Sequence, residues 1–98
     1  MEPFEETLGA IGERAKQLRL WRNFSQQELA IRAGIGSATV QRFEKTGHIS
    51  MENALRIAFA LGADDGFRRL FEPPKYSSLD EALAEPRSAG RKRARKRA

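Results

Sequence analysis

The chain has 98 residues, 40 % of them hydrophobic, which predicts a single domain with one modest core. It has no cysteine and one histidine, so disulfides, thiolate zinc sites, cysteine nucleophiles and a histidine-based metal cluster are excluded. The formal net charge is +5. No apolar run approaches the roughly 20 residues of a membrane span, and the N-terminus is acidic where a secretory signal is basic. We therefore expect a cytoplasmic protein with no membrane contact, metal or cofactor.

The first predicted helix begins near Pro3, which suits the first turn of a helix. Its apolar residues recur at helical spacing: Leu8, Ile11, Ala15 and Leu18. Asn23 is well suited to a left-handed residue that ends the helix. We expect Trp21 and Phe24, on either side of this stop, to belong to the core.

Two short helices separated by a three-residue turn are predicted next. Ser25 is a good N-cap, and Glu28 three residues later predicts a capping box for a helix over residues 26–33. Gly34 opens the turn with the positive φ that glycine adopts without strain. The second helix begins at Gly36 or Ser37 and ends near residue 45, before Gly47. The expected joint core of the pair is Leu29, Ala30, Ala33, Ile35, Val40 and Phe43.

Two further helices complete the predicted domain, residues 1–74. Ser50 is the N-cap of the first, which ends at Gly62, and its expected buried face is Leu55, Ala58 and Leu61. Asp64 or Asp65 is the expected cap of the second, which contributes Phe67, Leu70 and Phe71 before Pro73-Pro74 breaks the chain. Without any alternating β-type pattern, the predicted fold class is all-α.

Residues 75–98 form a predicted extension of different composition. A short amphipathic helix is expected over residues 79–84, ended by Pro86. Residues 1–74 hold ten Lys/Arg and ten Asp/Glu, residues 75–86 sum to −2, and residues 87–98 hold seven Lys/Arg and no acid. Such a basic block predicts a disordered tail whose partner is either nucleic acid, bound through phosphate contacts, or a protein. Its clustered basic residues are Arg91, Lys92, Arg93, Arg95, Lys96 and Arg97.

The stretch over residues 25–44 is typical of a helix-turn-helix, which places the N-terminal end of its second helix in the DNA major groove. The residues in register are Leu18-Arg19, Ser25-Gln26-x-Glu28-Leu29-Ala30, Gly34, Val40 and Phe43-Glu44. With these residues the chain resembles the phage-repressor/Cro-type helix-turn-helix family of transcriptional regulators, also called the xenobiotic-response-element family, over roughly residues 8–71. The resemblance implies a five-helix, lambda-repressor-like DNA-binding domain whose third helix reads DNA.

By register, the resemblance also implies roles for single residues. The base-facing positions are Ser37, Ala38, Thr39 and Arg42, and Gln26 matches a position that contacts phosphate. Arg19 and Glu44 match a buried ion pair with a structural role. The family usually has a hydroxyl residue where this chain has Gly36, so Gly36 or Ser37 caps the third helix.

Some roles remain open at this stage. Arg42 contacts either a guanine or a phosphate. Lys45, Thr46 and His48 contact the DNA backbone or lie in a solvated loop. Phe67, Leu70 and Phe71 complete the core or form the dimer seam that the family suggests.

The expected function is that of a repressor which binds an inverted-repeat operator as a homodimer. Its extension resembles, more weakly, those of antitoxins paired with kinase-type toxins. Residues 75–98 would then bind the toxin, and Tyr76, Leu79 and Leu83 form an amphipathic patch within them. A freestanding repressor and an RNA-binding or coactivator-type adaptor are the alternatives. An enzyme is not expected, because the sequence has no nucleophile–base pair, metal set or phosphate-cradling glycine loop.

Overall fold

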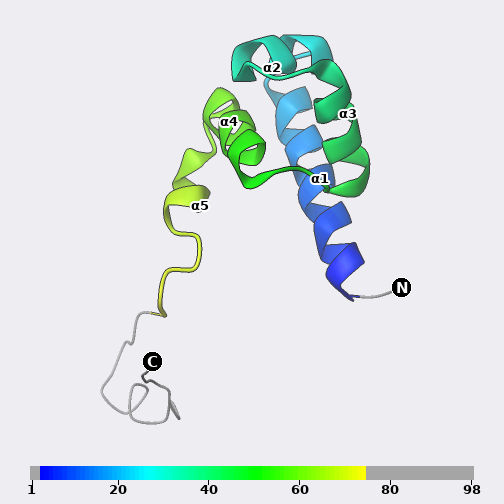
Figure 1. Ribbon diagram of the computed structural model, residues 1–98. Helices are drawn as coiled ribbons and strands as arrows, with labels where there is room; N and C mark the ends of the chain where they lie inside the picture. Colours follow the sequence, from blue (N-terminus) through cyan, green and yellow to red (C-terminus); the bar gives the residue numbers. More distant parts are fainter. Residues whose placement is uncertain (1–2, 75–98) are drawn as a thin grey trace, which may run out of the picture.

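The structure is a computed structural model that describes residues 3–74, and this part of the chain consists of five α-helices without a strand (Figure 1). The helices are α1 (Pro3–Trp21), α2 (Gln26–Ala33), α3 (Ser37–Thr46), α4 (Met51–Leu61) and α5 (Asp64–Arg68). The predicted all-α class is confirmed. The predicted helix over residues 79–84 and the basic tail over residues 87–98 lie outside the described residues.

The long helix α1 runs alongside α3, while α2 packs across the ends of both α3 and α4 (Figure 1). The short helix α5 packs on α4. The core lies where α2, α3 and α4 meet, and partly buried residues of α1 cover it. Its buried members are Leu29, Ala30, Ala33, Val40, Phe43, Ile57 and Leu61.

Most helix ends follow the local signals of the sequence. The Ser25 and Ser50 hydroxyls accept hydrogen bonds from backbone N–H groups at the starts of α2 and α4. Asn23 has a φ of 63°, and Gly34 has a φ of 73° at the end of α2. The expected capping box is only half formed, because the Glu28 carboxylate accepts a hydrogen bond from Arg32 on the exposed side of the helix.

The expected buried face of α4 is partly wrong. Ile57, Ala58 and Leu61 are buried, whereas Leu55 is 37 % exposed. Apolar residues continue from the buried face around to Met51, Leu55 and Phe59, so their spacing alone did not distinguish covered from exposed positions. The packing of α2 on α4, with residues of α1 and α3 close by, selects the face that is covered.

The expectation that Trp21 belongs to the core is also wrong, since its side chain is 77 % exposed. Arg19 points inward from the same helix, and a residue two positions later lies about 200° further around the helix axis. Phe24, by contrast, is half-buried and packs against the core.

The helix α5 differs from its prediction in both its start and its end. Asp64 and Asp65 lie within its first turn after the N-cap Ala63, and each pairs with an arginine four residues later. The helix ends at Arg68, which leaves Leu70 and Phe71 beyond it and exposed. These two side chains therefore do not complete the core.

Candidate nucleic-acid interface

The helices α2 and α3 are joined by the tight turn that a helix-turn-helix needs. Gly34 is left-handed, and its N–H group bonds to carbonyls of the last turn of α2. The following N-cap, Gly36, has extended backbone and provides no side-chain cap for α3. The Ser37 hydroxyl is therefore not used as the N-cap of α3.

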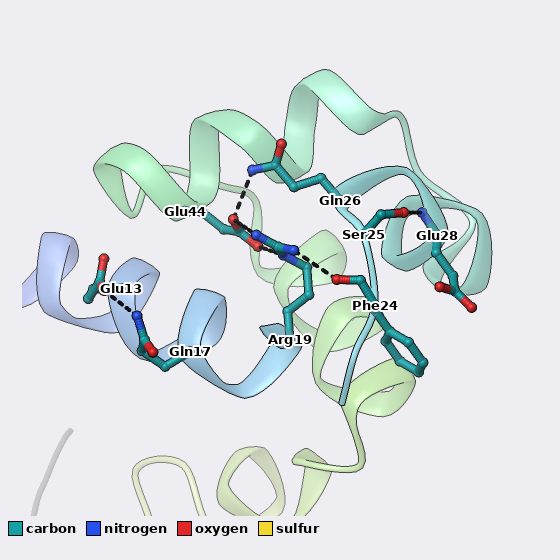
Figure 2. A network of polar contacts seen from close by, with 8 residues as sticks. All are labelled: Glu13, Gln17, Arg19, Phe24, Ser25, Gln26, Glu28 and Glu44. Atoms are coloured by element: carbon teal, nitrogen blue, oxygen red, sulfur yellow. Dashed lines mark hydrogen bonds and ion pairs between the residues drawn. The ribbon is translucent and has the colours of Figure 1, made fainter. Parts of the chain in front are cut away.

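A buried polar network fixes the orientation of α3 relative to α1 and α2 (Figure 2). Arg19 Nε donates to Glu44 Oε2 at 2.7 Å, and Arg19 Nη2 donates to Glu44 Oε1 at 3.0 Å. Gln26 Nε2 donates to the same Oε1 at 2.9 Å. Arg19 Nη1 also donates to the carbonyl oxygen of Phe24 at 2.8 Å. Both charges of this pair are thus hydrogen-bonded, as burial requires.

The side of α3 that points away from this network is exposed to solvent. Ala38, Gln41, Arg42 and Lys45 occupy positions i, i+3, i+4 and i+7 and are exposed, with Ser37 half-buried beside them. We call these five residues the reading face. Thr39, which the family register also implied, is half-buried at the edge of this face.

The basic side chains of the described residues divide into two groups. Six arginines hold an acidic or carbonyl partner: Arg19, Arg22, Arg32, Arg56, Arg68 and Arg69. Within residues 3–74, the side chains of Arg14, Lys16, Arg42 and Lys45 make no ion pair or protein hydrogen bond. Two of these four, Arg42 and Lys45, belong to the reading face, which therefore presents positive charge that no acidic residue of the described part of the chain pairs with.

The two other candidate residues that follow Lys45 are partly occupied by local contacts. Thr46 Oγ1 donates its proton to the Arg42 carbonyl oxygen at 2.8 Å and accepts from His48 N–H at 3.0 Å. His48 Nε2 lies 3.7 Å from Glu5 Oε1 of α1. The Thr46 hydroxyl thus shapes the turn after α3, and a phosphate would have to compete with that bond for its proton.

A hollow of about 420 Å³ lies beside the reading face, between α1 and α3, where the Gln26 amide also reaches. Its lining residues are Glu13, Lys16, Gln26, Gln41, Glu44 and Lys45. The interpretation of the sequence omitted Gln41, although its spacing from Ala38 and Lys45 already placed it on their face. It also omitted Lys16, for which no local signal exists, because only the packing of α1 on α3 brings it to this hollow.

The described residues contain no group of His, Cys, Asp or Glu side chains that could hold a metal ion. Within the same residues, no helix is both long enough and apolar enough to cross a membrane.

Comparison with known proteins agrees with the geometry. Residues 10–71 match a family of helix-turn-helix domains, and no curated protein matches the chain significantly. The match begins within α1 and ends at Phe71, after α5, and thus contains the whole reading face. It supports a DNA-binding regulator, and the chain belongs to the helix-turn-helix domain family.

Proposed function

We propose that the protein is a transcriptional repressor that places the reading face of α3 in the major groove of an operator. The observation that supports this most strongly is the free positive charge of that face. Arg42 and Lys45 are exposed there without a partner among residues 3–74, while the buried pair of Arg19 and Glu44 holds the helix in position. A rigid helix with free donors on one side suits base recognition.

We assign the direct base contacts to two long side chains of the reading face. The Arg42 guanidinium donates to both acceptors of a guanine, and the Gln41 amide pairs with an adenine. Ala38 has only a methyl group for contact with thymine. Ser37 and Thr39 are short and half-buried, so they contribute to the edge of the contact. Because few side chains read bases, DNA shape and half-site spacing supply part of the specificity.

Phosphate contacts are assigned to the residues around the hollow between α1 and α3. Gln26 donates one amide proton to Glu44 and keeps the second for a phosphate oxygen. Lys45 and Lys16 provide ammonium groups on either side of the same hollow. His48 and Thr46 continue this line after α3. These contacts position the reading face without carrying sequence information.

The repressor is proposed to act as a homodimer, since regulators of this size usually bind two-fold symmetric sites as two-fold dimers. Two reading faces would then contact half-sites separated by about one helical turn of DNA, roughly 34–36 Å. The operator is accordingly an inverted repeat.

The proposal is tested by selecting binding sites from random duplex DNA and then measuring affinity for selected and random duplexes. Arg42→Ala should weaken binding to the selected duplex about 5- to 150-fold, the equivalent of about 1–3 kcal/mol, and affect the random duplex less. Arg68→Ala is the matched control, because Arg68 is also exposed but pairs with Asp64 in α5. An equal loss on both duplexes would refute base reading by Arg42.

The antitoxin, freestanding-repressor and adaptor interpretations differ in what residues 75–98 bind, and those residues lie outside the described part of the chain. An antitoxin should co-purify with a stoichiometric partner that is lost when the chain is truncated after Pro74. A freestanding repressor should protect its operator without any partner. An RNA-binding adaptor should prefer RNA to the selected duplex in competition.

A further inference from the structure

The hollow between α1 and α3, which is proposed to receive a phosphate, also contains a negative charge. Glu13 of α1 lines this hollow together with Lys16 and Lys45, and all three side chains are exposed. The second acidic residue of the lining, Glu44, is buried and paired with Arg19. Glu13 is therefore the acidic group of this hollow that an approaching phosphate would meet.

The Glu13 carboxylate takes part in a hydrogen bond that leaves its charge in place. Gln17 Nε2, one helical turn further along α1, donates to Glu13 Oε2 at 2.8 Å (Figure 2). The glutamine amide is neutral, so this bond orients the carboxylate without cancelling its charge. Lys16, three positions after Glu13, is spaced for an ion pair on the helix surface. Within residues 3–74, however, Glu13 makes no ion pair.

Other acidic residues of the described helices are neutralised at the same spacing. Four of them pair with an arginine four positions later: Glu28, Glu52, Asp64 and Asp65. At the corresponding position after Glu13 the chain has Gln17. The negative charge beside the reading face is thus left uncompensated where an arginine at residue 17 would have paired with it.

We propose that Glu13 limits the affinity for DNA by repelling the phosphate that the hollow receives. This inference rests on the proposed function, because it needs a duplex seated on the reading face. Lys16 and Lys45 attract the phosphate and Glu13 opposes them, so the hollow offers one net positive charge in place of two. Phosphates carry no sequence information, so Glu13 lowers the affinity for every duplex alike and leaves discrimination to Arg42.

The test is Glu13→Gln, which removes the charge but keeps the side-chain length and an oxygen that accepts from Gln17. Affinities for the selected and the random duplex are measured at low and at high salt. At low salt the variant should bind both duplexes about two- to fivefold more tightly, the effect of one exposed charge pair. The gain should shrink at high salt, because salt screens exposed charges.

Glu72→Gln is the matched control for the change in net charge. Glu72 is also exposed and makes no ion pair among residues 3–74, but it follows α5 and does not line the hollow. This variant should bind both duplexes as the unaltered chain does. Thermal unfolding of both variants verifies that neither substitution changes the fold.

Lys45→Gln separates a failure of this inference from a failure of the proposed function. If the hollow receives a phosphate, Lys45→Gln should weaken binding to both duplexes. If it does so while Glu13→Gln leaves the affinity unchanged or lowers it, the proposal for Glu13 is wrong. If neither variant changes the affinity, the hollow does not contact DNA and both proposals fail. A gain of Glu13→Gln on the selected duplex alone would also overturn the inference, because it would assign Glu13 to a base.

Discussion

Glu44 lies in the second helix of the DNA-binding motif, yet its side chain points away from the reading face. It is only 6 % exposed and accepts hydrogen bonds from both Arg19 and Gln26. Gln26 thus connects the buried pair to the hollow where a phosphate is proposed to bind. The Glu44 side chain thus orients α3, while DNA contact is proposed for Arg42, two residues earlier.

Replacing Glu44 with Gln should destabilise the fold strongly. The substitution leaves the Arg19 guanidinium buried without its counter-charge, which typically costs about 3–5 kcal/mol. Chemical denaturation of the variant measures this loss. Glu52→Gln is the control, because the pair of Glu52 with Arg56 is exposed and contributes about 0–1 kcal/mol. If the two variants lost the same stability, the buried pair would not be the main tie between α1 and α3.

At the scale of whole elements, the close approach of α1 to α3 determines the position of the reading helix. Gly12 is buried in α1, where an added Cβ would overlap the carbonyl oxygen of Phe43 and lie 3.0 Å from that of Glu44. Gly47 ends α3 with a φ of 84° and lies against the backbone of Leu8. Two glycines thus let the backbones of α1 and α3 meet without side chains between them.

Gly12→Ala should therefore separate the two helices and destabilise the protein by about 1–3 kcal/mol, as overpacking does. Gly9→Ala is a matched control in the same helix, since nothing lies within 4 Å of its added Cβ. That variant should be more stable by up to about 1 kcal/mol, because alanine favours a helix interior. Thermal unfolding of both variants measures the difference. A neutral Gly12→Ala would mean that α1 is not held this closely to α3.

For the whole molecule, the distribution of charge matters more than its sum. Residues 1–74 balance ten basic against ten acidic residues, whereas residues 87–98 hold seven basic residues and no acid. The helical part therefore offers DNA a local cluster of positive charge, while the general attraction to phosphates is expected from the chain end. These two contributions respond differently to salt.

Deleting residues 87–98 should reduce the dependence of DNA affinity on salt. Each phosphate contact contributes about −0.9 to the slope of log affinity against log salt, so several tail contacts would change it measurably. The slope is obtained by titrating the same duplex at several salt concentrations. A chain with residues 87–98 replaced by an uncharged linker of equal length controls for shortening. An unchanged slope in both variants would show that the tail does not contact phosphate.

The sequence by itself determined the start of each of the first four helices, the helix-turn-helix and the stops at Asn23, Gly34, Gly47 and Gly62. Those signals act within one helical turn, so they do not depend on the rest of the fold. The Arg19 and Glu44 pair came only from the family resemblance. The tertiary structure alone decided which face of α4 is covered, that Trp21 is exposed, and that Lys16 lies beside Gln41. Each of these outcomes depends on how neighbouring helices pack. An apolar or a long polar side chain can be either buried or exposed, and only the neighbouring helix determines which.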